Sequence, residues 1–294
     1  MKNTLVDPSS SSSATAQTSG AAGRLLVVTP TLGLSTYLDR TVEGILALPV
    51  PFLHVLVCPE PVVTTLRERF PHATVLADAG KAAGLYGAIN VALHNIADPW
   101  EWFTYINDDD ELGPDFGRIA QQHFAAGNPE PVVYGEVRII DEVGGTISFL
   151  TLERDLANIP ALLRGGISPL SQQGMLFHRD VVRELVGFNT KYRICADLDF
   201  WARALAAGRR FHYYAAEMGR FRIRRGQISG DVGLTTREQD EIACRLFPAA
   251  GGAVHRWLAK WRFRARNFPR YLARSRTVGW ISSNQILAGG GQRG

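Results

Sequence analysis

The chain has 294 residues, 46% of them hydrophobic and 20% charged, with a net charge of +4, which is typical of an ordinary globular protein with one large domain and an appendage. Its three cysteines, Cys58, Cys195 and Cys244, are odd in number and show no CxxC spacing. This argues against a disulfide framework and a cysteine-based zinc site, and it favours a reducing compartment.

The N-terminal segment, residues 1–22, is rich in serine and alanine and has no apolar core. It therefore matches neither a secretory signal nor a membrane-spanning helix, and we expect a disordered tail. No later apolar run reaches the roughly 18 residues that a transmembrane helix needs. We expect a soluble, cytoplasmic protein, or at most a peripheral one at the inner face of the cell membrane.

Between residues 24 and 112, short apolar runs alternate with amphipathic stretches. Four candidate strands are RLLVVT, FLHVLVC, ATVLAD and WFTYIN. Apolar residues at helical spacing predict one helix after the first strand, ended by Pro49, and a second over 86–96. This alternation predicts βα units, and hence a Rossmann-like α/β fold with a mixed, mostly parallel sheet flanked by helices.

The later elements no longer follow the strand–helix alternation that predicts parallel strands. VVYGEVRII and TISFL flank the turn-rich DEVGG and predict a hairpin. A strand (GMLFH), a helix over 197–207 and two strands (RFHYY and GRFRI) complete the predicted α/β domain, to which we assign residues 23–232. Residues 233–294 form a basic, aromatic-rich helical extension.

Three loops are the candidates for a binding site, because ligands of open α/β sheets bind beyond the carboxyl ends of the strands. They are TPTLG, DAGKAAGLYG and NDDDEL. The glycines Gly80, Gly84 and Gly87 fit neither GxGxxG nor GxxxxGK[ST], which disfavours ordinary dinucleotide and P-loop sites.

The acidic loop NDDDEL directly follows a strand that reads as buried. Clustered carboxylates repel and resist desolvation, so a cation or several donors must lie among them. Asp108 and Asp110, separated by one residue, can turn toward one hard cation such as Mg²⁺ or Mn²⁺, which leaves Asp109 for a sugar or ribose. The alternative is a calcium-stabilised or solvated turn.

The order of these motifs resembles a known family. TPTLG, DAGKAAGLYGAINVAL, YINDDDEL, VVYGEVRIIDEVGGTI, SQQGMLFHRDVV, VGFN, ADLDFWARALAAG and RRGQIS follow the order and spacing of family 2 glycosyltransferases, and the chain looks like the members that assemble bacterial polysaccharides. The resemblance spans roughly 24–231. It implies a GT-A fold that binds a nucleoside-diphosphate sugar, with NDDDEL similar to the DxD element that holds a metal under the pyrophosphate.

The chain departs from the family pattern at several positions. After the second strand, where the family usually has an acidic residue for the nucleobase, the chain reads LVCPEPVV, and Glu60 is a displaced substitute. Gly87 and Asn107 stand where relatives have aspartates, and Ala196 precedes Asp197 in place of a glutamate. These departures weaken any inference about the nucleobase.

Two aspartates in ADLDFWARALAAG are candidates for chemistry. Asp199 and Arg203 are four residues apart, which predicts an ordinary ion pair on one side of a helix. Asp197 has no such cation, and its structural alternative is a helix N-cap. The resemblance implies that Asp197 is the general base, which accepts the proton of the acceptor hydroxyl in an inverting displacement.

The resemblance also implies Mn²⁺ or Mg²⁺ as a Lewis acid on the leaving nucleoside diphosphate. The other candidate binding residues are Thr29, Thr31, Glu60, Asp78, Lys81, Asn90, Asp109 and Arg225 on the donor side, and Gln172 and Gln173 on the acceptor side. Many have plain structural alternatives: turn or cap formation for the threonines and Asp78, a solvated side chain for Lys81 and Arg225, and a structural hydrogen bond for Asn90.

The C-terminal extension concentrates positive charge. Residues 242–294 hold ten Lys and Arg and no acidic residue, so they carry +10, and the other residues of this +4 chain carry −6. Aromatic residues interleave with these cations. The pattern suits a helix at an anionic membrane surface, a helix packed on the domain, or an RNA contact. Pro269 predicts two short helices.

A metal-dependent inverting glycosyltransferase, acting on a saccharide or lipid-linked acceptor in cell-surface polysaccharide or glycolipid assembly, is the leading hypothesis. A nucleotidyltransferase that makes sugar nucleotides is disfavoured, because TPTLG lacks a Lys- or Arg-bearing glycine-rich signature. A noncatalytic nucleotide- or polyanion-binding protein, with a calcium site in the acidic loop, is the third alternative.

Overall fold

The computed structural model describes residues 24–78, 80, 84–97, 99–125, 130–224, 227 and 231–278. The tail expected over 1–22, together with Lys81 and Arg225, lies outside these residues. The strands are β1 (Leu25–Pro30), β2 (Phe52–Cys58), β3 (Thr74–Ala77), β4 (Trp102–Tyr105), β5 (Glu111–Leu112), β6 (Val132–Ile140), β7 (Thr146–Phe149), β8 (Met175–His178) and β9 (Phe211–Arg222). The helices are α1 (Leu38–Leu46), α2 (Val63–Arg69), α3 (Gly84–Asn95), α4 (Phe116–Ala125), α5 (Ile159–Leu163), α6 (Arg179–Leu185), α7 (Ala196–Ala206), α8 (Val232–Leu246), α9 (Ala253–Arg266) and α10 (Phe268–Val278).

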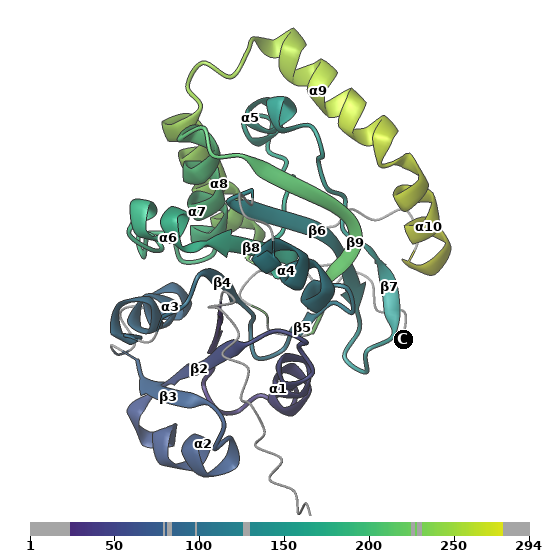
Figure 1. Ribbon diagram of the computed structural model, residues 1–294. Helices are drawn as coiled ribbons and strands as arrows, with labels where there is room; N and C mark the ends of the chain where they lie inside the picture. The colour runs from purple at the N-terminus through teal and green to yellow at the C-terminus, as the bar shows by residue number, and fades with distance from the viewer. Residues whose placement is uncertain are drawn as a thin grey trace, which may run out of the picture.

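The strands form one mixed sheet in the order β3-β2-β1-β4-β8-β6-β9-β5, with β7 paired to β6 (Figure 1). The four N-terminal strands run parallel, and β8 is antiparallel to β4. Beyond β8, β6 and β9 are parallel to each other, while β5 and β7 are antiparallel to their neighbours. The predicted fold class is confirmed: a mixed α/β sheet with helices on its faces and further helices at the C-terminus.

Alternation of side chains along β1 explains how helices come to cover both faces of the sheet. Leu26 and Val28 point into the core shared with α3, α7 and α8, whereas Leu25 and Val27 point to the opposite face, under α1 and α4. All four side chains are fully buried. A strand covered on both faces is a continuous apolar run, which is why RLLVVT was recognisable from sequence.

The last strand of the sheet differs from the prediction. We expected two strands, RFHYY and GRFRI, but the chain forms a single strand, β9, over Phe211–Arg222. Of the intervening AAEM, only Glu217 has a partner on β6, Glu136, and register shifts on either side of this pair absorb the other three residues. The prediction of two strands was therefore wrong, because a bulge rather than a turn accommodates the small and charged residues.

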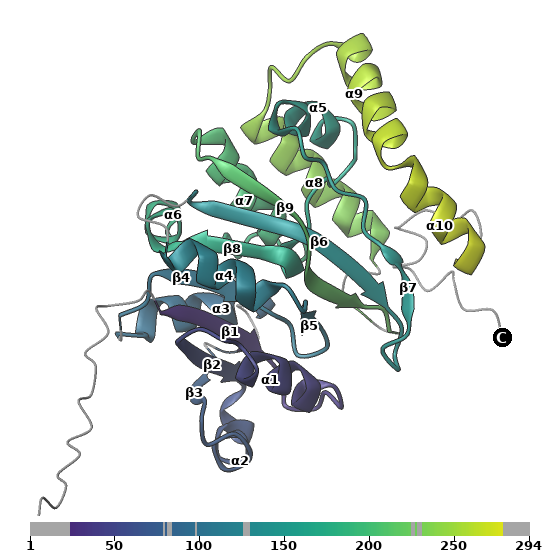
Figure 2. The ribbon, with the colours of Figure 1, turned by 45° about the vertical axis from the view of Figure 1, so that its right-hand side comes forward.

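The C-terminal helices were predicted correctly as two segments. Pro269 is the second residue of α10, where its missing N–H costs no helical hydrogen bond. Figure 2 shows α9 and α10 running along one side of the molecule, past α5 and β7. The preceding helix α8 joins the main core through Ile242 and Ala243. Within the described residues, no helix is both long and apolar enough to cross a membrane.

Candidate active site

A large pocket opens at the carboxyl ends of the N-terminal parallel strands. Its volume is about 1710 Å³, larger than the several hundred Å³ typical of a site for one small ligand. On one side it is lined by Thr31, Asp108 and Asp109, which lie at the carboxyl ends of β1 and β4. The opposite side is lined by residues of α7 to α10, among them Asp197. A pocket of this size can hold two substrates side by side.

The acidic loop contributes two carboxylates to this pocket. The Asp108 carboxylate accepts a hydrogen bond of 2.6 Å from the Thr31 hydroxyl. The Asp109 carboxylate pairs with the Arg224 guanidinium, with 2.5 Å between Oδ2 and Nε. Burial raises the pKa of Asp108, so its charge is sensitive to any cation that enters the pocket. The positive charge that the sequence required near this loop is supplied from the end of β9.

Asp110 lies behind the pocket and is fully buried. Its Oδ1 accepts from the backbone N–H of Arg222 at 2.9 Å, and its Oδ2 accepts from the side-chain amides of Gln173 at 3.0 Å and Asn107 at 3.1 Å. Burial, followed by the nearby Asp109 charge, raises the pKa of Asp110 to about 8. A carboxyl group held in this way fixes the shape of the loop.

The side chain of Arg222 is also fully buried and ties the acidic loop to the rest of the fold. Its Nε donates to the carbonyl oxygen of Asp109 at 2.9 Å, and one terminal nitrogen donates to the carbonyl oxygen of Asp141 at 2.9 Å. The other terminal nitrogen pairs with the Glu111 carboxylate. Sequence reasoning did not single out Arg222 or Arg224. The only signal was the expectation of a nearby cation, and the chain offered many.

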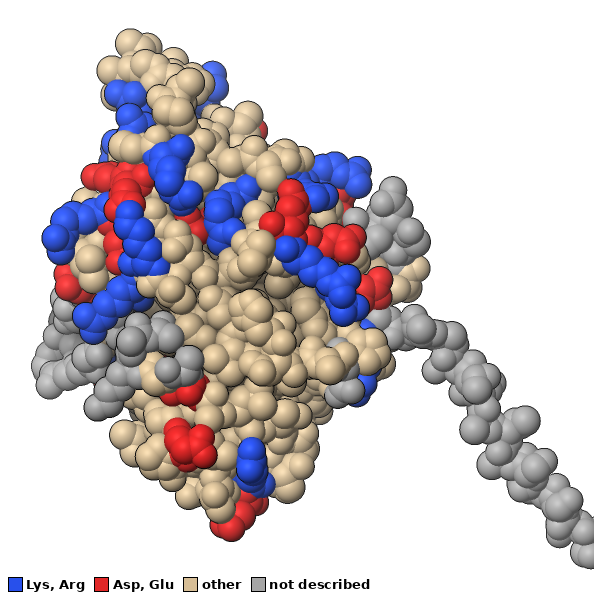
Figure 3. All heavy atoms as spheres, turned by 90° about the vertical axis from the view of Figure 1, so that its left-hand side faces the viewer, with Lys and Arg blue, Asp and Glu red and all other residues tan. Residues whose placement is uncertain are grey.

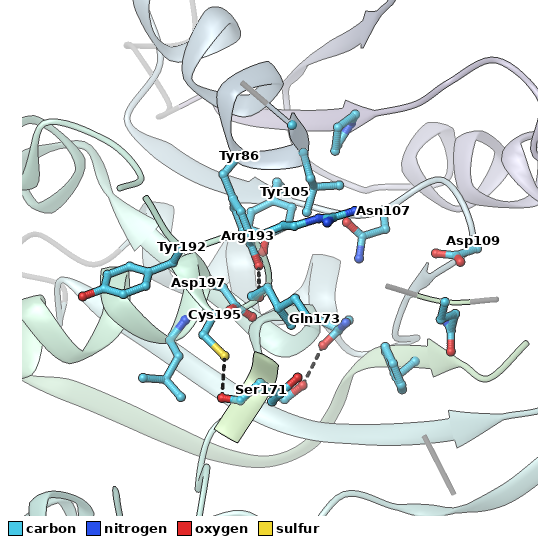
Figure 4. A pocket seen from close by; sticks show the side chains of 18 of the residues that line it. Tyr86, Tyr105, Asn107, Asp109, Ser171, Gln173, Tyr192, Arg193, Cys195 and Asp197 are labelled. Atoms are coloured by element: carbon cyan, nitrogen blue, oxygen red, sulfur yellow. Dashed lines mark hydrogen bonds between the residues drawn. The ribbon is translucent and has the colours of Figure 1, made fainter. Parts of the chain in front are cut away.

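Across the pocket, Asp197 is the second residue of α7 rather than its N-cap. Burial raises the pKa of this carboxyl to about 6, although hydrogen bonds to the Leu198 N–H, at 2.7 Å, and to Tyr86 partly oppose the shift. Figure 4 shows Asp197 beside Tyr86 and Tyr105, facing the same space as Asp109. A carboxylate with a pKa near neutrality, facing a pocket, can accept a proton.

The neighbouring Asp199 has a different environment, as predicted. Its carboxylate is fully buried and pairs with Arg203, with 2.7 Å between Oδ2 and Nε, and also with Arg245. Two guanidinium groups hold it away from the pocket. The predicted ion pair with Arg203 is confirmed.

Glu238 on α8 holds the loop that leads into α7, just before Asp197. Its buried carboxylate accepts three backbone hydrogen bonds, from the N–H groups of Arg193, Ile194 and Cys195, at 2.8, 2.9 and 2.8 Å. These residues lead directly into the first turn of α7. No local pattern predicts this contact, because Glu238 and Cys195 are 43 residues apart and a glutamate in a helix is usually a solvated surface residue.

The other candidate residues divide into two groups. Thr31, Glu60, Asp78, Asp109 and Gln173 line the pocket with Asp108 and Asp197, whereas Thr29, Asn90, Asp110 and Gln172 do not.

The residues outside the pocket have structural partners. The Thr29 hydroxyl contacts His54 at 3.2 Å. The Asn90 amide makes two 2.8 Å hydrogen bonds to the backbone of Phe188, which is the structural alternative foreseen for it. Gln172 donates to the carbonyl oxygen of Tyr105.

The donor set at the acidic loop fits a hard divalent cation that is shared with a ligand. Among the described residues, no group of three or more His, Cys, Asp and Glu side chains surrounds a common point. However, Mg²⁺ typically uses only one or two protein carboxylates and takes its other ligands from phosphates and water. Asp108 and Asp109 supply two such carboxylates, and the buried Oδ1 of Asn107, which also lines the pocket, has no hydrogen-bond partner among the described residues.

Comparison with known proteins supports the same family that the order of the sequence motifs resembles. Residues 22–246 match the family model described as "Glycosyltransferase like family 2". No curated protein matches the chain.

Among solved structures, the chain is similar to S. aureus TarS. The structure of TarS 1–349 with UDP-GlcNAc is 15% identical with a TM-score of 0.56, and the match covers 90% of this chain and 78% of that one. The complex of TarS 1–349 with UDP is 14% identical with a TM-score of 0.53, covering 90% and 77%. In a longer TarS structure, 14% identical with a TM-score of 0.55, the match covers 90% of this chain and 50% of that chain. At these identities the likeness concerns the fold.

Proposed function

The chain belongs to glycosyltransferase family 2, and from this premise we propose that it transfers a sugar from a nucleoside-diphosphate sugar to an acceptor hydroxyl, with inversion at the anomeric carbon. One observation carries the proposal. Carboxylates of two kinds face one pocket: Asp108 and Asp109 at the ends of the parallel strands, and the isolated Asp197 on α7. Asp108 and Asp109 can bind a cation together with a diphosphate, and Asp197 can accept a proton.

We assign the donor side of the reaction to the acidic loop. Asp108 and Asp109 would hold Mn²⁺ or Mg²⁺, which when bound supplies Lewis-acid stabilisation to the departing diphosphate. From sequence alone we placed this role on Asp108 and Asp110. Asp109 replaces Asp110 in the proposal because Asp110 is outside the pocket and its oxygens are engaged by three N–H donors. Arg224, beside Asp109, adds positive charge where the leaving group gains negative charge.

Asp197 acts on the acceptor side as the general base. In one displacement, the acceptor oxygen forms a bond to the anomeric carbon while the bond from that carbon to the phosphate oxygen breaks. The nucleoside diphosphate leaves with the electron pair, and the hydroxyl proton passes to the Asp197 carboxylate. Because the pKa of Asp197 is about 6, the group is mostly ionised at neutral pH and still basic enough to take the proton.

The acceptor is proposed to be a saccharide, free or lipid-linked, in the assembly of a cell-surface polysaccharide or glycolipid. The volume of the pocket leaves room for it beside the donor, and Gln173 lies between the acidic loop and the Asp197 side. TarS has been crystallised with UDP and UDP-GlcNAc, which makes UDP sugars the first donors to test. Glu60 and Asp78, at the ends of β2 and β3, are the proposed contacts to the nucleoside.

The metal assignment predicts opposite outcomes for two adjacent substitutions. In the unmodified protein, Mn²⁺ is expected to strengthen UDP binding by at least about fivefold, because cation and diphosphate stabilise each other. Asp109→Asn should abolish this coupling, since it removes a ligand, whereas Asp110→Asn should retain it, since the Asp110 carboxyl lies outside the pocket. Isothermal titration of UDP with and without Mn²⁺ measures both effects.

If coupling is instead lost in Asp110→Asn and kept in Asp109→Asn, then Asp110 rather than Asp109 is the metal ligand. Absence of coupling in the unmodified protein would favour a noncatalytic polyanion-binding role. The thermal melting temperature of each variant, measured without ligand, serves as the control for folding.

Asp197 also sets the expected pH dependence. A general base works only when ionised, so kcat/KM should fall about tenfold per pH unit below its pKa and level off above it. With burial raising that pKa to about 6, the bend should lie near pH 6 rather than near 4. Initial rates with a UDP sugar between pH 4.5 and 8 test this. A profile flat down to pH 4.5 would exclude Asp197 as the base.

A further inference from the structure

The last two helices expose large apolar side chains to solvent. The outward face of α9 and α10 consists of Val254, Trp257, Leu258, Trp261, Phe268 and Leu272. Trp257 and Trp261 are 62% and 60% exposed, and these two with Phe268 are the only exposed tryptophans and phenylalanines among the described residues. Exposed aromatic residues that cluster on one surface indicate an interaction site.

The spacing of these residues shows that they do not hold the helices to the domain. Val254, Trp257 and Trp261 recur at intervals of three and four, and so share one side of α9. Ala259 and Phe263, on the other side, are buried against α5. The extension therefore packs on the domain, but the alternative in which its aromatic rings lie in the core holds for Phe263 and not for Trp257 and Trp261, which belong to a second, outward apolar stripe.

All the charged Lys, Arg, Asp and Glu side chains on these two helices are positive. Residues 253–278 contain eight Lys and Arg and no acidic residue. Three arginines face the domain: Arg266 pairs with Glu153, Arg270 pairs with Glu136, and Arg274 donates to the carbonyl oxygen of Phe149. Arg262 and Arg276 are exposed, and neither pairs with any acidic residue that the structure describes.

Another face of the molecule provides a contrast. In Figure 3, which looks at the side carrying α6 to α8, basic and acidic side chains are intermixed over the upper part. Ion pairs on and beside α6 to α8 include Lys191 with Glu241 and Arg209 with Glu184. What distinguishes α9 and α10 is the combination of an exposed apolar stripe with cations and the lack of any acidic residue on either helix.

We propose that the outward face of α9 and α10 docks onto the surface of an anionic lipid bilayer, with both helices lying in the plane of the interface. Tryptophan is enriched at the headgroup level of membranes, where its ring is buried and its N–H stays hydrated. Arg262 and Arg276 lie where they can meet lipid phosphates. The helices are charged, and neither meets the length and hydropathy of a spanning helix, so they lie on the bilayer.

Two other occupants fit these observations less well. A second copy of the chain would bring this surface against itself in a symmetric dimer, and cations would face cations with no acidic partner on either helix. A nucleic acid would satisfy the arginines, but Val254, Leu258 and Leu272 would gain nothing from phosphates or bases. A bilayer surface accounts for both the aliphatic and the cationic side chains.

Docking would place the proposed acceptor side of the pocket at the membrane. The same helices contribute Phe263, Arg264 and Tyr271 to the pocket lining, so its wall and the outward face are two sides of one layer. An acceptor carried on a lipid would then enter beside α9. This consequence rests on the proposed function, whereas the docking itself does not.

The test is flotation of the full chain with vesicles of phosphatidylcholine alone and of phosphatidylcholine with phosphatidylglycerol. We expect binding to the anionic vesicles only, weakened by salt. Trp257→Ser with Trp261→Ser should lower the vesicle partition coefficient at least about tenfold, because both rings leave the interface. Arg262→Gln with Arg276→Gln should lower it severalfold. The matched control, Arg183→Gln with Arg237→Gln, removes two exposed arginines elsewhere and should keep binding.

UDP binding by the same variants, measured separately, should be unchanged, because none of the substituted residues lines the pocket. Failure of vesicle binding with intact UDP binding overturns the docking proposal and leaves the proposed function standing. Equal loss in the control variant also overturns it. The docking proposal is also overturned if the unmodified protein is a dimer that dissociates in the tryptophan variant. It is overturned as well if the unmodified protein binds single-stranded RNA but no vesicles, and the tryptophan variant loses the RNA binding.

Discussion

Asp197→Asn is expected to lower kcat by about 10²–10⁴-fold while leaving UDP binding intact, because it removes a proton acceptor without touching the donor side of the pocket. The asparagine keeps the oxygen that accepts from the Leu198 N–H, so the first turn of α7 should be preserved. Single-turnover rates and UDP titration on the same preparation separate chemistry from binding. A variant that keeps its turnover would show that another group takes the proton.

The same substitution should stabilise the protein at neutral pH. Burial raises the pKa of Asp197 from 3.8 to about 6, so the folded state holds this proton to a higher pH than the unfolded state. The stability that protonation contributes is complete below pH 3.8 and is lost as the pH rises through about 6. Above that range the loss approaches about 3 kcal/mol for a shift of about two units. Asparagine does not ionise and avoids the loss.

Urea denaturation at two pH values tests this expectation. Asp197→Asn should exceed the unmodified protein in free energy of unfolding at pH 8 by about 1–3 kcal/mol, and match it at pH 4. Asp199→Asn is the matched control on the same helix. Because it leaves Arg203 and Arg245 without their buried carboxylate, it should destabilise the protein instead. A destabilised Asp197→Asn would mean that the carboxylate is held by unrecognised donors.

Arg222→Ala is expected to cost about 3–5 kcal/mol of folding free energy, the largest stability effect that we predict for a side chain outside the pocket. The guanidinium is fully buried and contacts the Glu111 carboxylate and the carbonyl oxygens of Asp109, Asp141 and Glu142. Its removal leaves the Glu111 carboxylate with only the Arg220 guanidinium, at 3.3 Å, and takes one donor from each of the three carbonyl oxygens. The free energy of unfolding, measured by urea denaturation at pH 7, gives the magnitude.

Two further variants distinguish this mechanism from a loss of packing. Adding Glu111→Gln to Arg222→Ala should recover part of the stability, since it removes the carboxylate charge that has lost its buried guanidinium partner and keeps only Arg220. Arg69→Ala, which breaks the exposed pair with Asp39, should cost less than about 1 kcal/mol. If Arg222→Ala proves as mild as Arg69→Ala, the acidic loop does not depend on this cation.

The elements that were predicted well from the sequence are those that depend only on residues close together along the chain. The four apolar runs between 24 and 107 became β1 to β4 because strands buried on both faces must be continuously apolar. Pro269 separated α9 from α10 because of its own backbone chemistry. The pair of Asp199 with Arg203 followed from helical spacing. None of these depends on what the rest of the chain does.

The candidate site was predictable only in part. The order of motifs along the chain pointed to the acidic loop and to Asp197, and the structure brings Asp108, Asp109 and Asp197 to one pocket. Which aspartate of the run faces the pocket could not be read from spacing. A short loop has no fixed period, and the donors that turn Asp110 inward come from Gln173 and from the backbone of Arg222.

By itself, the sequence determined the fold class, the family resemblance, the concentration of cations in the last 53 residues and the two helices that carry them. The tertiary structure decided which charges meet. Arg222 and Arg224 reach the acidic loop across more than a hundred residues, and Glu238 holds the entrance of α7 from another helix. It also decided that one side of α9 is buried while the tryptophans stay outside. The physical reason is that propensity and apolar periodicity are written in neighbouring residues, whereas electrostatic partnership and burial depend on distances in space that only the packed chain defines.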